Sequence, residues 1–152
     1  MGKLQKLLIG GMLGLLACFN AQAENYVDVG EYKIHYNAVP THLLTPEVAR
    51  AYGIQRSQNR AMLNVTVLRK GGEGQLDTAI TAKVGASATN LTGQRREIDM
   101  RLISEQEAHY YIGEVRVANE ENLEFKVQVL PDGVAEPFEL AFRQKFYVAD
   151  DG

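Results

Sequence analysis

The segment Leu-Glu-Phe-Lys-Val-Gln-Val, residues 123–129, alternates large apolar side chains with charged or polar ones. A period of two places Leu123, Phe125, Val127 and Val129 on one face of a β-strand and the polar residues on the other. Such a strand covers a hydrophobic core on one side and meets water on the other, as strands of antiparallel sheets do. This segment therefore predicts an antiparallel β fold.

The same alternation recurs along much of the chain. Four further segments show it, at residues 63–67, 80–88, 97–102 and 138–142. The stretch 94–103 also allows a helix, because Glu97 and Arg101 have helical spacing, and we favour the strand.

In two other segments, the apolar residues switch between odd and even positions (a change of parity) at a glycine. Residues 27–36 do so at Gly30, and residues 110–117 at Gly113. This predicts a bulge or bend at each glycine, and at Gly30 a strand that changes sheets. Together the strands predict an all-β fold, an immunoglobulin-like antiparallel β-sandwich of about seven strands.

The connection after the first strand is long for a compact sandwich. Within it, Thr45 as N-cap, a proline next to it and Gly53 past the end predict one short helix in the long loop after the first strand. Val48 and Tyr52 share one side of this helix, which favours packing against the sandwich. Loops of this length are usually functional or close an open end of the fold.

A leader precedes the sandwich. A positively charged start is followed by an uncharged apolar stretch at residues 7–19, and Ala21 and Ala23 supply the small residues of a cleavage site. This pattern predicts a signal peptide at residues 1–23 and a single β-sandwich domain at residues 24–152. The chain is therefore expected to be exported.

Cys18 allows another interpretation of the leader. The run Leu15 to Cys18 is similar to a lipobox, so the alternative is a protein anchored by lipid through Cys18. If the signal peptide is cleaved before Glu24 instead, no cysteine remains in the domain. Disulfides, thiol chemistry and cysteine-ligated metals are then excluded, and stability must come from the core.

Charge and hydropathy exclude two further classes of protein. The net charge is -3 and the basic residues are dispersed, which argues against a nucleic-acid partner. No apolar run after the leader is long enough for a transmembrane segment.

Catalytic and metal-binding motifs are not found. His35, His42 and His109 lie in different segments without the spacing of metal ligands. No serine stands in a nucleophile motif. We therefore expect no catalytic residues, no cofactor and no metal, and do not expect an enzyme.

The best binding candidates lie at the exit of the long loop, where arginines gather in an otherwise acidic chain. They are Tyr52, Gln55, Arg56, Asn59 and Arg60. Arginine and tyrosine combine contact area with hydrogen-bond donors, which suits docking of an anionic ligand or an acidic partner. The alternative is that these arginines only pair with acidic side chains of neighbouring strands.

Residues 36–70, "YNAVPTHLLTPEVARAYGIQRSQNRAMLNVTVLRK", resemble the domain of unknown function 4426, a family of exported gamma-proteobacterial proteins. The motifs "SATNLTGQ" at 87–94 and "YYIGEV" at 110–115 are similar to the same family. The resemblance implies a periplasmic immunoglobulin-like β-sandwich and no known activity. The function expected is a periplasmic, non-catalytic binding or adaptor module for an envelope protein, docking at the loop or at a sheet edge. The alternative is a small-ligand-binding protein or enzyme with a site assembled across loops.

Overall fold

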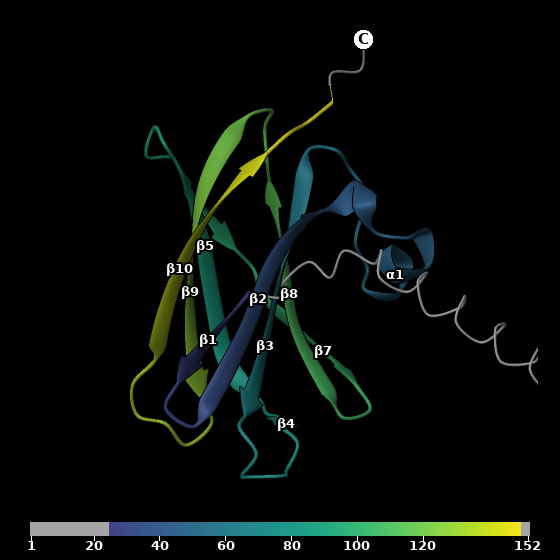
Figure 1. Cartoon of the computed structure of the whole chain (residues 1–152). Coiled ribbons are helices and arrows are strands. Elements are labelled where there is room, and N and C mark those ends of the chain that lie inside the picture. Colours follow the sequence, from purple (N-terminus) through teal and green to yellow (C-terminus); the bar gives the residue numbers. More distant parts are fainter. Residues whose placement is uncertain (1–24, 150–152) are drawn as a thin grey trace, which may run out of the picture.

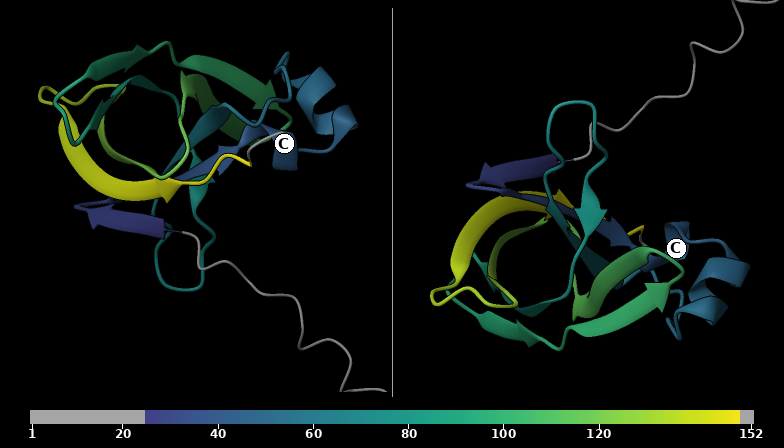
Figure 2. Two further views of the ribbon diagram at one scale, coloured as in Figure 1. Left: turned by 90° about the horizontal axis from the view of Figure 1, so that it is seen from above. Right: turned by 90° about the horizontal axis from the view of Figure 1, so that it is seen from below.

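The computed structural model describes residues 25–149, and the predicted signal peptide and Cys18 lie outside this range. Two antiparallel sheets pack face to face around one core (Figure 1; Figure 2). Within the described range, no helix is long and apolar enough to cross a membrane. The predicted all-β, antiparallel sandwich is confirmed.

Within residues 25–149, ten strands form the two sheets, where about seven were predicted. The first sheet has the order β1 (Asn25–Val29), β2 (Tyr32–Pro40), β3 (Arg60–Arg69), β8 (Ala108–Arg116) and β7 (Arg101–Glu105), with β4 (Thr78–Ala79) pairing to β3. The second has the order β10 (Phe138–Phe146), β9 (Glu121–Pro131), β5 (Ala82–Asn90) and β6 (Arg95–Ile98). The 3-10 helix η1 (Thr41–Leu43) and the helix α1 (Pro46–Ala51) lie between β2 and β3.

The core consists of the apolar faces that the alternation predicts. Its fully buried members include Leu63, Val65 and Val67 of β3 and Leu123, Phe125, Val127 and Val129 of β9. The ring of Phe125 stacks on Phe142 with the centroids 4.8 Å apart, and Phe146 meets it edge-on at 6.1 Å. Burial of these side chains is the main source of stability in a domain of this size.

Gly30 lies in a tight reversal and not in a bulge. With Glu31 it connects β1 to β2, and Val29 pairs directly with Tyr32. The φ angle of Gly30 is +57°, a conformation that suits glycine in the first position of a two-residue hairpin. The prediction that one strand changes sheets here is wrong. The parity shifts because residues that pair across this turn, such as Val29 and Tyr32, face the same side of the sheet. Residues 27–36 therefore belong to two strands, and the short helix follows the second of them.

Residues 94–103 do not form one strand. β6 ends at Ile98 and pairs with β5, whereas β7 begins at Arg101 and pairs with β8 in the other sheet. The chain crosses between the sheets at residues 99–100. The alternation continues through this crossover because Ile98 and Met100 both reach the core, whereas Leu102 is exposed.

β8 runs through Gly113 in regular register with β3, so the predicted bend is also wrong. Tyr111 and Val115 face the core, while Tyr110 and Ile112 lie on the outer face of the sheet. The apparent change of parity arises because both faces of β8 are apolar and both are covered. Gly113 is required by the crossover: a β-carbon there would lie 2.5 Å from Cγ2 of Ile98 and 2.8 Å from the backbone oxygen of Asp99.

A seam of side chains joins β2 to β10 and closes the sandwich on one side. The ring of Tyr36 lies 4.7 Å from that of Phe142, and Tyr32 lies 5.8 Å from Phe138. Gln144 donates a hydrogen bond of 2.9 Å from Nε2 to the carbonyl oxygen of Ala38. Contacts between side chains therefore take the place of a backbone ladder along this seam.

The helix in the long loop begins and ends as predicted. The Thr45 hydroxyl accepts a hydrogen bond from the amide of Val48, and Gly53 has a φ of +66°. The amide of Ile54 bonds to the carbonyl of Ala49 and that of Gly53 to Arg50, which is a Schellman ending.

The side of the helix that packs is not the predicted one. Ala49 and Ile54 are buried against Met62 and Ile112 on the outer face of the first sheet, whereas Val48 is 38% exposed. Tyr52 contributes to this second small core as predicted. The loop therefore covers the outer face of β3 and β8 and does not plug an end of the sandwich.

Candidate functional site

The five predicted binding residues do not form one patch. Tyr52 packs on Tyr110 with the ring centroids 6.4 Å apart, and burial, followed by the nearby charge of Glu105, raises its pKa. Gln55 is exposed. Arg56 is also exposed, but its guanidinium donates a 3.0 Å hydrogen bond to the carbonyl of His42 within the same loop.

Thr41 holds the two ends of this loop together. It is fully buried, and its hydroxyl donates to the carbonyl of Ser57 at 3.0 Å and accepts from the amide of Ser57 at 2.9 Å. This pair of bonds fixes the backbone that leads into Asn59 and Arg60. The loop is thus a braced element that positions its exit.

We expect Thr41→Val to destabilise the protein by about 2 kcal/mol, because valine keeps the volume but leaves both polar groups of Ser57 without a partner. Chemical denaturation and hydrogen exchange at the Ser57 amide measure this. The comparison is Thr45→Ala, which removes a helix cap and should cost about 1 kcal/mol. Unchanged exchange at Ser57 in Thr41→Val would contradict the clamp.

Asn59 and Arg60 line a hollow at one end of the sandwich. It has a volume of about 420 Å³ and is lined by Ser57, Asn59, Arg60, Arg96, Arg116, Val117 and Ala118. Its three arginines come from three separate strands: the start of β3, β6 and the end of β8. We call these residues the basic hollow.

The three arginines differ in their counter-charges. Arg96 is bound by Glu121 at 2.7 Å, and Arg60 lies 3.6 Å from an oxygen of Glu114. The Arg116 side chain is exposed and forms no ion pair within residues 25–149. The side chain of Arg116 is therefore available for an external anion.

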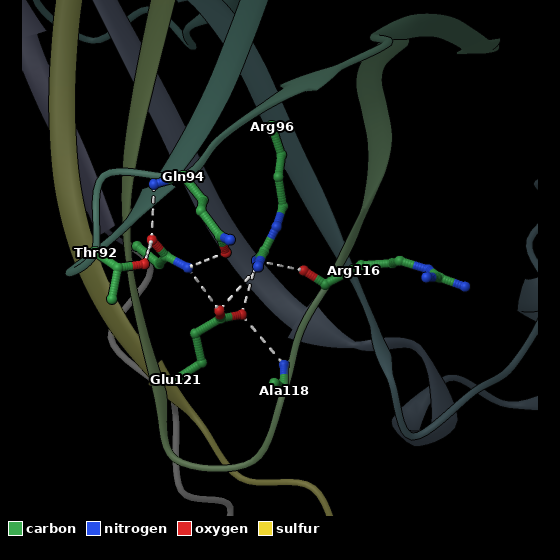
Figure 3. A network of polar contacts seen from close by, with 7 residues as sticks. Thr92, Gln94, Arg96, Arg116, Ala118 and Glu121 are labelled. Atoms are coloured by element: carbon green, nitrogen blue, oxygen red, sulfur yellow. Dashed lines mark hydrogen bonds and ion pairs between the residues drawn. The ribbon is translucent and has the colours of Figure 1, made fainter.

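A polar network braces the wall of the basic hollow (Figure 3). Arg96 donates two hydrogen bonds to the carboxylate of Glu121, at 2.7 and 2.8 Å, and a third of 3.0 Å to the carbonyl of Arg116. Glu121 also accepts from the amide of Ala118 and from the side chain of Asn90. Such a bidentate pair positions the end of β8 rigidly.

The network fixes the charges of both partners. Hydrogen bonds from Arg96 are the largest of the effects that lower the pKa of Glu121 to about 2. The bond to Glu121 in turn raises the pKa of Arg96. Both groups are charged at neutral pH, so the pair acts as a structural brace.

Arg96 and Arg116 were missed as site residues by sequence reasoning. The sequence did contain a signal for this pair of charges. Arg96 is two positions before the buried Ile98, and Glu121 is two positions before the buried Leu123. Both charges therefore stand in core-facing positions of their strands. A charge in such a position requires a partner. No comparable pattern marks Arg116, which faces solvent at the end of β8.

The histidines do not converge on a metal site. Among residues 25–149, no three His, Cys, Asp or Glu side chains form a group that could hold a metal ion. His109 Nδ1 lies 2.9 Å from the hydroxyl of Ser104 across the β7–β8 hairpin. No carboxylate of the described residues is hydrogen-bonded to this imidazole, and the pair is exposed, unlike the oriented base of a serine hydrolase.

Comparison with solved structures gives relatives of the whole sandwich. A crystal structure of a DUF4426 family protein from Pseudomonas aeruginosa PAO1 has 28% identity and a TM-score of 0.71, covering 84% of this chain and 97% of that one. FetP of uropathogenic Escherichia coli, expressed in the periplasm, has 11% identity and a TM-score of 0.59, covering 84% and 95%. A copper-bound variant of FetP has 12% identity and a TM-score of 0.60, covering 84% and 97%.

At 11–12% identity, the two FetP structures show the fold alone. No curated protein matches the chain. The family model described as "Domain of unknown function (DUF4426)" matches residues 26–149, which is nearly all of the described sandwich. The predicted resemblance is therefore confirmed, and the chain belongs to the DUF4426 family.

Proposed function

We propose that this protein is a non-catalytic periplasmic binding module whose basic hollow docks an acidic segment of an envelope protein. The observation that carries the proposal is the exposed side chain of Arg116, which has no counter-ion within the described residues and belongs to a residue that lines the basic hollow together with Arg60 and Arg96. Arginine forms bidentate bonds to carboxylates, and the backbone of Arg116 is held by the hydrogen bond that Arg96 donates to its carbonyl oxygen.

The chemistry of the basic hollow supports binding over catalysis. Its acidic neighbour Glu121, with a pKa of about 2, stays ionised at neutral pH and cannot supply a proton as a general acid. The side chains of the lining residues are three arginines, one amide, one hydroxyl and two apolar groups. They can hold an anion but include no activated nucleophile.

The proposed compartment rests on two lines of support. The leader has the pattern of a signal peptide, and FetP, which shares the fold, was expressed in the periplasm. The copper of one FetP structure belongs to that protein. The described residues of the present chain include no group of three His, Cys, Asp or Glu that could hold a metal ion.

Site-specific photo-crosslinking in the periplasm tests the proposal, with the probe at Asn59 on the rim of the basic hollow. We expect one dominant protein adduct, whose yield falls about tenfold in Arg116→Glu because a paired charge becomes a repulsive one. The matched control is Arg143→Glu, since Arg143 is an exposed arginine bound to Glu124 on β9. This control should leave the adduct unchanged.

Two outcomes would contradict docking at the basic hollow. One is an adduct that survives Arg116→Glu, and the other is an adduct that Arg143→Glu removes equally, which would indicate non-specific charge attraction. A probe at Gln55 tells whether the partner also covers the loop. If no protein adduct forms and small carboxylates raise the melting temperature of the wild type but not of Arg116→Glu, the hollow binds a small anionic ligand instead.

A further inference from the structure

β7 is a free edge of the first sheet. It pairs with β8 from Arg101 opposite Ile112 to Glu105 opposite Ala108, and within residues 25–149 no strand pairs with its other side. Figure 1 shows β7 at the border of the sheet, beside β8. One row of its backbone N–H and C=O groups is therefore open to another strand.

The side chains of β7 show a symmetric pattern. Arg101 and Glu105 stand two positions on either side of Ile103, on the outer face of the sheet, and both are exposed. Neither forms an ion pair within the described residues. Leu102, on the other face, is 44% exposed. The strand thus carries a positive charge, an apolar centre and a negative charge in order.

We propose that a second copy of this chain pairs antiparallel with β7, about a two-fold axis through Ile103. Arg101 then lies opposite the partner's Glu105, and Glu105 lies opposite the partner's Arg101. Directly opposed charges of unlike sign stabilise a strand pair. The two first sheets join into one continuous sheet.

Other registers do not satisfy the same side chains. A slip of one residue between the strands places the outer-face residues of one copy opposite inner-face residues of the other. A slip that moves the axis to Leu102 or Ser104 places one of the two charges opposite Ile103 and carries the other past the end of the partner strand, so neither charge of β7 meets an unlike charge of β7. With the axis through Ile103, residues that lie opposite each other always have the same parity and so face the same side of the sheet. The proposal therefore does not depend on which residues of β7 direct their backbone N–H and C=O groups outward.

The other edges of the sandwich lack this arrangement. β10 is covered by the seam with β2, where Gln144 bonds to the Ala38 carbonyl. β6 carries Arg95 and Glu97, but these pair with each other at 2.6 Å within the same strand. Asp28 on β1 is already paired with Lys70. On β7, the Arg101 guanidinium donates to the carbonyl of Tyr52, but neither Arg101 nor Glu105 has a counter-ion among the described residues.

The seam is short, so the dimer is expected to be weak. β7 has five residues, and one strand pair of that length buries less than the roughly 800 Å² per partner of a standard interface. We expect a dissociation constant of about 10 µM to 1 mM, within the range of transient contacts. Two charge pairs and one ladder of backbone hydrogen bonds supply its specificity.

Sedimentation velocity from about 10 µM to about 1 mM tests the proposal. We expect the mean mass of the wild type to rise from monomer toward dimer across this range. Glu105→Arg should remain monomeric, because it places two arginines opposite each other twice. The matched control is Glu107→Arg, a charge reversal in the turn next to β7. This control should dimerise like the wild type.

A mixing experiment separates charge pairing from general damage. Arg101→Glu alone is also expected to be monomeric, but an equal mixture of Arg101→Glu and Glu105→Arg restores both charge pairs and should form a heterodimer. Arg101 also donates to the carbonyl of Tyr52, so the melting temperature is used to verify that this variant folds. If it does not fold, Glu105→Arg against Glu107→Arg decides alone. A monomeric wild type at all concentrations, or dimerisation of Glu105→Arg, would overturn the proposal.

Discussion

Gly113→Ala is expected to lower the free energy of unfolding by about 3 kcal/mol, although it adds a single methyl group. That β-carbon would lie 2.5 Å from Cγ2 of Ile98, 2.7 Å from Sδ of Met100 and 2.8 Å from the backbone oxygen of Asp99. The two side chains can move, but the oxygen belongs to the backbone of the crossover. Relief therefore requires the crossover to lift off β8 and uncover the core beneath it. Chemical denaturation measures the loss.

The control for this prediction is Gly85→Ala on β5. A β-carbon at Gly85 meets nothing within 4 Å, so the change should be neutral or stabilise by about 0.5 kcal/mol, as replacement of a strand glycine does. Equal effects of the two substitutions would show that backbone entropy, and not the close approach, determines the result at Gly113. Such a result would contradict the role given to the crossover.

Removal of Glu121 is the second substitution with a large expected effect. Glu121→Ala leaves Arg96 without its counter-ion in a partly buried position and the amide of Ala118 without an acceptor. It also removes one of the two acceptors of the Asn90 side chain, which keeps its bond to Gln94. The Glu121 side chain is 13% exposed. We expect a loss of about 2–3 kcal/mol at pH 7, measured by denaturation. Glu97→Ala, which breaks an exposed pair with Arg95, should cost less than about 0.5 kcal/mol.

The same carboxylate should make the wild type sensitive to acid. Its pKa is about 2 in the folded protein against an ordinary value of 4.5, so the unfolded chain takes up its proton first as the pH falls. The stabilisation is complete above pH 4.5 and is lost between pH 4.5 and about 2. This contribution, about 2 kcal/mol after solvent screening, should be missing from the pH profile of Glu121→Ala. A profile as steep as that of the wild type would contradict it.

The sequence predicted the fold where one residue pattern determined one structure. The alternation of residues 123–129 and 63–67 placed their apolar side chains in the core, because a strand has two faces and one of them was wholly apolar. The predictions of a bulge or bend at Gly30 and Gly113 failed, because a change of parity can have several physical causes. A reversal of the chain and a second covered face produce the same pattern as a bulge.

The candidate site was predicted only in part, for a related reason. Asn59 and Arg60 were named because they stand in a local cluster, but the basic hollow also takes Arg96 and Arg116 from strands far along the chain. Their convergence depends on which strands become neighbours, and no short-range pattern contains that information. Arg56 was named for its charge, yet its hydrogen bond holds the carbonyl of His42 within its own loop.

The place of β9 in the chain also determines when the molecule can fold. β9 lies between β5 and β10 in the second sheet and supplies Phe125 to the centre of the core, yet it begins at Glu121. A nascent chain that emerges with its N-terminus first has no stable second sheet until β9 has appeared. Until then, the apolar faces of its earlier strands remain uncovered, and exposed apolar surface of this kind is what chaperones recognise. Folding is therefore completed late, when almost the entire chain is available.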